Sequence, residues 1–143
     1  MTQEKNATQL RPVVDFIKTP EQGEPYLEGH KCRKCGAIFI GARDTCSKCC
    51  TMGQMEPVRL SNSGTLYSYS IVYRSYPGVQ VPFVTAIIDL DGGGTVKGNL
   101  IGVEPDAAKI PFGMSVQVIY KDPGKTDKEG NHYLCYFFQP RQP

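Results

Sequence analysis

The chain has 143 residues, enough for one ordinary domain or two small ones, and its net charge of +2 is too small to indicate nucleic-acid binding by itself. No apolar run approaches the ~18 residues that a membrane-spanning helix needs, and the first residues lack the apolar segment of a secretory signal. We therefore expect a cytoplasmic protein without a membrane anchor. Fifteen glycines, eleven prolines and eight tyrosines are typical of a turn-rich, mainly β protein.

Residues 1–30 are predicted to form an N-terminal arm. They are mostly polar and contain one apolar cluster, formed by Val13, Val14, Phe16 and Ile17. Thr19-Pro20-Glu21 resembles a helix start, but Gly23 and Pro25 limit any helix to about one turn. Because the cluster has no evident intramolecular core to enter, we expect the arm to dock on another surface. A disordered tail is the alternative.

Residues 31–57 carry two Cys-x-x-Cys pairs, Cys32/Cys35 and Cys46/Cys49, with ten residues between them. Each pair forms a tight turn that aims two thiolates at one point. Four thiolates make the closed tetrahedral donor set of structural zinc. Gly36 suits the turn after the first pair, where the chain often needs a positive φ. The sequence therefore predicts a zinc ribbon, with a short strand at residues 37–40 and a linker at residues 52–57.

The cysteines allow other interpretations. Two structural disulfides are a weaker alternative, since such adjacent pairs are poor disulfides and no export signal is present. A redox motif would occur singly beside a βαβ pattern. Iron in a rubredoxin-like centre remains open, because the same turn suits both metals. Cys50 is not counted as a ligand, because Cys46-x-x-Cys49 repeats the spacing of the first pair.

Basic residues surround the four cysteines: Lys31, Arg33, Lys34 and Lys48. Their positive charge helps to keep thiols ionised and offsets the negative charge of a four-thiolate zinc centre. A metal at this site would be structural, because four protein ligands leave no open position for a substrate.

Residues 58–143 are predicted to form a five-stranded OB-fold barrel. The apolar residues alternate with period two from Val58 onward, which indicates strands. These strands are expected at residues 60–76, bent at Gly64, and at residues 83–90, 95–101, 114–120 and 132–138. One or two helical turns are expected at residues 104–110, and tight turns at residues 76–78 and 91–94. Three strands, a short helix and two more strands is the OB-fold order.

No catalytic residue is predicted. Gly92-Gly93-Gly94 lacks the spacing of a nucleotide-binding loop and is expected to be a hairpin turn. His30 and His132 have no evident acid–base partner, and Cys135 lies in an apolar strand, where a core thiol is expected.

The chain resembles a family of OB-fold, acyl-CoA-associated proteins with a rubredoxin-like zinc ribbon. The matching segments are Cys32-x-x-Cys35-Gly36, Ala42-Arg43-x-x-Cys46-x-x-Cys49, Ser63-Gly64-Thr65-Leu66-Tyr67-Ser68-Tyr69, Pro82-Phe83-x-x-Ala86 and Ile110-Pro111-Phe112-Gly113-Met114-x-Val116. Two features depart from the family pattern. Gly23 and Pro25 interrupt a helix expected before the first cysteine, and Ala42 replaces a proline.

The resemblance implies a non-catalytic subunit of a thiolase-type acyl-CoA enzyme. Family members accompany thiolase-like enzymes, acyl-CoA hydratases or aldolases, so a larger thiolase-fold partner would supply the catalytic residues. Structural zinc would bind Cys32, Cys35, Cys46 and Cys49, and a coenzyme A thioester would be the substrate of the complex, at or near the interface. A single-stranded nucleic-acid-binding module and an iron electron-transfer protein are the alternatives.

Overall fold

The computed structural model describes residues 10–141, which divide into two compact units. The first contains residues 10–60 and Tyr120–Tyr136, and the second contains Ser61–Ile119 and residues 137–141. Residues 1–9 of the predicted arm and residues 142–143 of the predicted barrel lie outside the described part. No helix among the described residues is long and apolar enough to cross a membrane.

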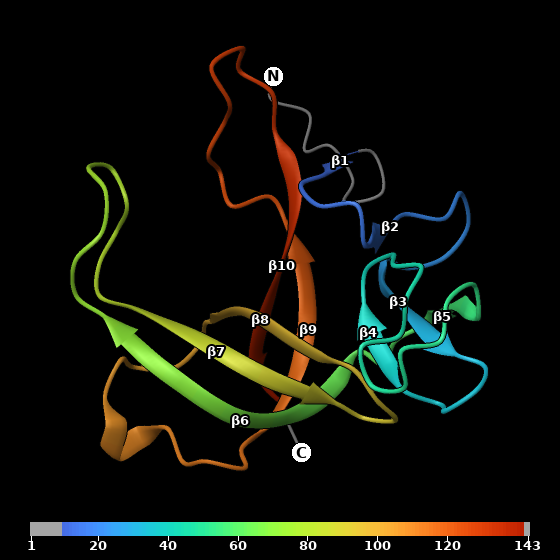
Figure 1. Ribbon diagram of the computed structural model, residues 1–143. Helices are drawn as coiled ribbons and strands as arrows, with labels where there is room; N and C mark the ends of the chain where they lie inside the picture. The colour runs from blue at the N-terminus through green and yellow to red at the C-terminus, as the bar shows by residue number, and fades with distance from the viewer. Residues whose placement is uncertain (1–9, 142–143) are drawn as a thin grey trace. The chain divides into compact units, whose positions relative to one another are not determined.

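The first unit is a small β structure around one central strand. Its strands are β1 (Arg11–Pro12), β2 (Ile17–Lys18), β3 (Tyr26–Cys32), β4 (Ile38–Ile40) and β5 (Met55–Arg59) (Figure 1). Strand β3 pairs antiparallel with β2, β4 and β5. At Gly29, a Cβ atom would lie 2.8 Å from the carbonyl oxygen of Phe39, so this position requires glycine for close strand approach.

The apolar cluster at residues 13–17 does not behave as predicted. Ile17 is only 2% exposed and lies opposite Leu27, which is fully buried. Phe16 packs against Tyr136 with ring centroids 5.7 Å apart, whereas Val13 remains half exposed. The prediction that the cluster lacks an intramolecular core is therefore wrong for Ile17. The chain reverses between β2 and β3 through Gly23, whose φ is +112°, and this reversal supplies the missing partner.

Two further local predictions are corrected in this unit. Residues 52–57 were predicted as a linker, but β5 begins at Met55 and pairs with β3 from Cys32↔Met55 to Glu28↔Arg59. The helix start at residues 19–21 does not form a helix, because Pro25 and the positive φ of Gly23 divert the chain into β3. The expected strand between the two Cys-x-x-Cys pairs is confirmed as β4.

The mainly β fold with an OB-fold barrel is confirmed. The barrel strands are β6 (Ser63–Val72), β7 (Phe83–Leu90), β8 (Thr95–Leu100), β9 (Ser115–Lys121) and β10 (Tyr133–Pro140). The order β10–β8–β7–β6–β9 closes through a further pairing of β9 with β10, and β1 adds to β10 (Figure 1). Closure leaves no free strand edge in the ring of five.

Alternation of side chains builds the core of the second unit. Along β7, Val84, Ala86, Ile88 and Leu90 are buried while the residues between them are half-buried or exposed. Gly64 pairs with both Leu90 and Val116, and a Cβ atom there would lie 2.5 Å from the carbonyl oxygen of Asp89. The first barrel strand is shorter than predicted. Its pairing with β7 shifts register at a β-bulge between Leu66 and Ser68.

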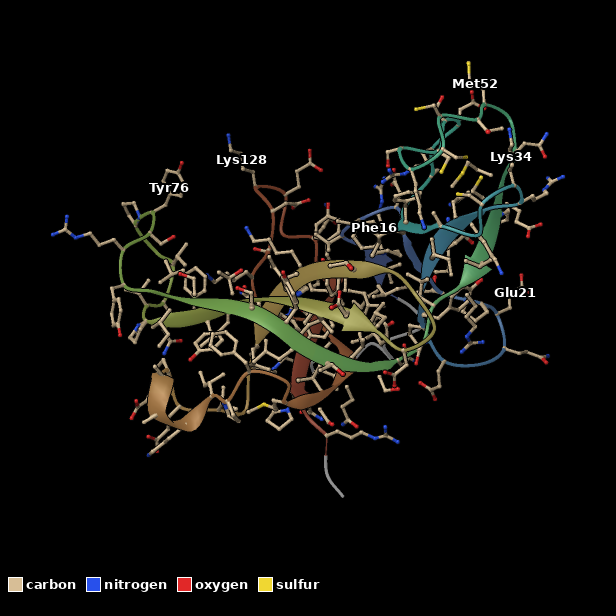
Figure 2. All side chains as sticks on the ribbon, turned by 60° about the horizontal axis from the view of Figure 1, so that its bottom comes forward. Phe16, Glu21, Lys34, Met52, Tyr76 and Lys128 are labelled. Carbon is tan, nitrogen blue, oxygen red and sulfur yellow. The ribbon has the colours of Figure 1, made fainter. Side chains whose placement is uncertain are left out.

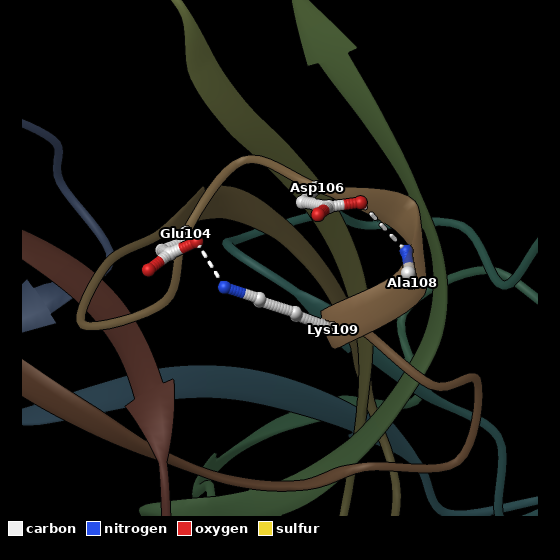
Figure 3. Close-up of polar contacts among 4 residues, drawn as sticks. All are labelled: Glu104, Asp106, Ala108 and Lys109. Atoms are coloured by element: carbon white, nitrogen blue, oxygen red, sulfur yellow. Dashed lines mark hydrogen bonds and ion pairs between the residues drawn. The ribbon is translucent and has the colours of Figure 1, made fainter.

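The expected helical turn before β9 is a 3₁₀ helix, η2 (Ala107–Lys109). Asp106 caps it by accepting a hydrogen bond from the backbone N–H of Ala108 at 2.9 Å, and Lys109 pairs with Glu104 (Figure 3). The hairpin turn at residues 91–94 is also confirmed, since the backbone N–H of Leu90 donates to the carbonyl of Gly94.

Candidate metal centre

Each Cys-x-x-Cys pair forms a turn that is called here a knuckle. The first knuckle, which contains Cys32 and Cys35, begins at the end of β3. The backbone N–H of Gly36 donates to the carbonyl of Cys32 at 2.9 Å, and the N–H of Cys32 donates to the carbonyl of Ala37 at 2.8 Å. Gly36 has a φ of +80°, as its place in the sequence suggested. These contacts fold the chain tightly enough to turn Cys32 and Cys35 toward each other.

The second knuckle repeats this geometry residue for residue. The N–H of Cys50 donates to the carbonyl of Cys46 at 2.8 Å, and the N–H of Cys46 donates to the carbonyl of Thr51 at 3.0 Å. Cys50 has a φ of +63°, so it occupies the position that Gly36 holds in the first knuckle. Its side chain is exposed and lies outside the cysteine cluster. The repeat explains why Cys50 is a turn residue, a conformation that its residue type alone does not indicate.

The structure brings the four predicted cysteines together. Their sulfur atoms all lie within 4.8 Å of one another, with 3.7 Å between Cys32 and Cys49 and 3.5 Å between Cys35 and Cys46. A tetrahedron with metal–sulfur bonds of about 2.3 Å has sulfur–sulfur edges of about 3.8 Å. A disulfide bond would need about 2.05 Å. The cluster therefore fits a metal ion and contains no disulfide.

Polar groups around the cluster favour ionised sulfur at some of its members. The hydroxyl and backbone N–H of Thr51 lower the pKa of Cys49 to about 6, and the Cys49 Sγ lies 3.2 Å from the Thr51 Oγ1. The backbone N–H of Cys49 lowers the pKa of Cys46. The backbone N–H of Ala37 acts to lower the pKa of Cys35, yet burial and the neighbouring thiols together raise it to about 11. Four thiolates at this distance repel one another, and a divalent cation would remove that repulsion.

The predicted basic surroundings are present. Lys31, Lys34 and Lys48 are exposed, and Figure 2 shows Lys34 extending from the ribbon near the yellow sulfur atoms. Arg33 pairs with Glu56 at 3.5 Å. Arg43 lies over the ring of Phe39, 4.1 Å from its centroid, and thus supports β4.

Three other polar groups, Asp89, Asp91 and His132, have structural partners. Asp89 accepts a hydrogen bond from Thr95, and Asp91 accepts one from Ser63. The expectation that His132 lacks an acidic partner is wrong, because its Nδ1 lies 2.6 Å from a carboxylate oxygen of Asp122. Nine residues lie between the two in sequence, and the loop between β9 and β10 returns the chain to bring them together. His30 has a buried Nδ1 without a hydrogen-bond partner.

No second metal cluster appears among residues 10–141. Within this range, only the four cysteines form a group of three or more Cys, His, Asp or Glu side chains whose donor atoms lie close enough together to hold a metal ion. Cys135 is half-buried, and burial followed by the charge of Asp122 raises its pKa. A thiol with a raised pKa is a poor nucleophile at neutral pH. The described residues thus present one four-cysteine site on a β scaffold.

Comparison with known proteins defines the class of this scaffold. The "ChsH2, C-terminal OB-fold domain" family matches residues 57–121. A "DUF35 domain-containing scaffold protein" of Methanocaldococcus jannaschii is 30% identical over 116 residues, which cover 80% of this chain and 81% of that protein. The chain belongs to the DUF35 family, whose members include ChsH2-type OB-fold domains.

Two other matches come from named complexes. "Benzoylsuccinyl-CoA thiolase subunit BbsA" of Geobacter metallireducens is 35% identical over 77 residues, 53% of this chain and 51% of that protein. The chain therefore aligns with about half the length of this relative. The solved structure "Ltp2-ChsH2(DUF35) aldolase" matches with a TM-score of 0.63 and 25% identity, covering 80% of this chain and 84% of that one. These three relatives are thus a scaffold protein, a thiolase subunit and part of an aldolase.

Proposed function

We propose that the protein is a non-catalytic, zinc-binding subunit of a thiolase-type acyl-CoA enzyme. The observation that carries the proposal is membership of the DUF35 family, combined with a closed four-cysteine cluster as the one candidate metal site among the described residues. A relative named as a thiolase subunit and a structural match from an aldolase support a catalytic partner. The chain would stabilise that partner and help to form its acyl-CoA site.

Zinc is the proposed metal, with Cys32, Cys35, Cys46 and Cys49 as its ligands. The sulfur spacing and the all-thiolate donor set support it, and a bound zinc ion would fix the two knuckles as one unit. Iron would suit the same donors, and visible colour of the purified protein would identify it.

The chemistry is proposed to lie in the partner. Thiolytic cleavage of a 3-oxoacyl-CoA needs a nucleophilic thiol and a base. Cys135 has a raised pKa, and the side chain of His132 is held by Asp122. We expect the isolated chain to turn over no 3-oxoacyl-CoA, and detectable thiolysis by the purified chain alone would refute this.

A narrower version names the substrate. Likeness to the benzoylsuccinyl-CoA thiolase subunit supports a 3-oxoacyl-CoA substrate of the benzoylsuccinyl type. The narrower version also places the enzyme in anaerobic toluene degradation. Such an enzyme would be cytoplasmic and would bind neither nucleic acid nor membrane. The division into an N-terminal arm (1–30), a zinc ribbon (31–57) and an OB-fold domain (58–143) belongs to the same proposal.

A single-stranded nucleic-acid-binding module is the competing function. Exposed Tyr67, Tyr73 and Tyr76 on the barrel unit favour it, because aromatic rings stack on bases. Salt-dependent retardation of single-stranded DNA or RNA by the purified chain would support this alternative.

The test is purification of the tagged chain from the organism that encodes it. We expect a thiolase-fold chain to co-elute in fixed stoichiometry, and we expect thiolysis only when both chains are present. Elution of the full-length chain without any thiolase-fold chain would contradict the proposal.

A further inference from the structure

The connection between β6 and β7 exposes an unusual amount of apolar surface. This segment, residues 73–82, is called here the aromatic loop. Tyr73 is 66% exposed and Tyr76 is 84% exposed, and Val79 and Val81 are each more than a third exposed. Figure 2 shows Tyr76 pointing away from the rest of the chain at the tip of this hairpin. A water-facing loop of ten residues is normally polar unless it contacts something.

A backbone hydrogen bond shapes the tip of the aromatic loop. The N–H of Val79 donates to the carbonyl of Tyr76 at 3.1 Å, and Gly78 has a φ of +88°. This turn places Tyr76 and Val79 at the tip of the loop, where both side chains are exposed. A preshaped loop loses little conformational entropy when it binds.

Charge on the aromatic loop is confined to one residue. Arg74 is exposed, and among the described residues it has no ion pair or hydrogen bond. By contrast, the loop between β9 and β10 contains five charged residues, and its Asp127 accepts hydrogen bonds from Glu129, Asn131 and Tyr133. The second loop thus forms hydrogen bonds among its own residues. In the aromatic loop, the rings of Tyr73 and Tyr76 and the guanidinium of Arg74 have no such contacts among the described residues.

We propose that the aromatic loop is the element that docks the chain on its catalytic partner subunit. It would insert Tyr73, Tyr76 and Val79 into an apolar groove of that subunit, whose rim carries a carboxylate facing Arg74. Tyrosine and arginine are the residues that most often dominate binding energy at protein interfaces, and lysine and acidic residues are depleted there. This inference rests on the proposed function, because it assumes a thiolase-fold partner.

The charge of the loop argues against other occupants. In a symmetric dimer of this chain, two aromatic loops would bring like charges, Arg74 and its copy, into one interface. Single-stranded nucleic acid needs a groove with several positive charges along its backbone, and the loop supplies one. An anionic membrane surface likewise attracts clusters of basic residues. One positive charge among aromatic rings suits an apolar protein surface with a single acidic group.

The experiment compares two loops of the full-length chain. The test variants are Tyr76→Ser combined with Val79→Ser, and separately Arg74→Glu. The matched control is Lys128→Glu, which makes the same charge change on the internally hydrogen-bonded loop between β9 and β10. Each protein is checked for metal content and thermal unfolding. Its Kd is then measured by calorimetry with the purified thiolase-fold chain that co-elutes with the wild type.

We expect each test variant to keep its metal and its unfolding temperature and to raise Kd about tenfold or more, while Lys128→Glu leaves Kd within about threefold. If the test variants bind as tightly as the wild type, the docking role is overturned while the proposed function stands. A different occupant of the loop would also overturn the docking role. The sign would be test variants that keep their affinity for the partner but lose self-association, binding to single-stranded DNA or binding to phosphatidylserine vesicles. If no thiolase-fold chain co-elutes with the wild type, the proposed function itself fails.

Discussion

The ribbon and the barrel hold β structure together by different means. Of residues 33–54, all of which the structure describes, Cys46 alone is buried, and the segment includes just one three-residue strand. The second unit buries a continuous apolar core. Its buried residues are Leu66, Val84, Ala86, Ile88, Leu90, Val96, Leu100, Ile110, Val116, Val118 and Phe138. The ribbon has no such core that could keep it folded after the loss of a metal ligand.

This difference shows what the cysteines contribute. A segment with so few buried apolar side chains gains little hydrophobic stabilisation, so cross-linking through a metal must supply most of its folding free energy. A closed barrel gains its stability from packing and needs no metal. The two regions should therefore respond to different perturbations, and four substitutions test this.

The largest effect is expected for Cys35→Ser. Metal binding to four thiolates contributes on the order of 10 kcal/mol in small zinc modules, so losing one ligand should unfold the ribbon. Metal analysis should show that the variant holds less than half an equivalent of zinc. Cys50→Ser, four residues beyond Cys46 and outside the cluster, is the control and should keep one equivalent. A Cys35→Ser protein with a full equivalent of zinc would show that the ligand assignment is wrong.

Ile88→Ala tests the barrel core. Ile88 is fully buried, and truncating such a side chain typically costs about 2–5 kcal/mol. Its neighbour Ile87 is 37% exposed, so Ile87→Ala should cost less than about 1 kcal/mol. Urea unfolding followed by tyrosine fluorescence measures both. Metal content should stay unchanged in each variant, and loss of zinc from Ile88→Ala would mean that the two regions are not independent.

Gly64→Ala tests the close approach of strands in the barrel. The added Cβ would lie 2.5 Å from the backbone oxygen of Asp89, which cannot move without disturbing the β6–β7 pairing. We expect a loss of about 1–3 kcal/mol in the free energy of unfolding. Thr65→Ala, at an exposed site on the same strand, should cost less than about 1 kcal/mol. Equal effects of the two substitutions would rule out the steric explanation.

The smallest effect is expected for Thr51→Val. Removing the hydroxyl 3.2 Å from the Cys49 sulfur should lower metal affinity about tenfold without unfolding the ribbon. Competition with a chromophoric chelator measures the affinity. Thr45→Val is the control, because the exposed Thr45 side chain makes no hydrogen bond to the cluster. An affinity equal to that of the wild type would show that Thr51 has no role in positioning Cys49.

Local patterns predicted the barrel well. The alternation of apolar residues placed β7 at residues 83–90, and both ends agree with the structure. The spacing of the four cysteines predicted which sulfur atoms would meet, because each Cys-x-x-Cys turn is defined by its own backbone. Where a short stretch of chain determines its own geometry, the sequence is informative.

Features that depend on distant partners were not predictable in this way. Strand β3 contains Glu28, His30 and Lys31, and its identity follows from pairing with β2, β4 and β5. The pairing of His132 with Asp122 depends on how the connecting loop returns. Each of these is fixed by a contact that no local pattern encodes.

Hydrogen exchange during removal of the metal tests the central claim most directly. The purified chain would be treated with a zinc chelator, and amide protection would be compared between the ribbon and the barrel. We expect the knuckle amides of Cys32, Gly36, Cys46 and Cys50 to lose protection, while the barrel amides of Leu66 and Leu90 keep theirs. On this account, the metal holds the ribbon and the barrel packs independently. Loss of amide protection in both regions together, or its retention in both after the metal has left, would contradict that account.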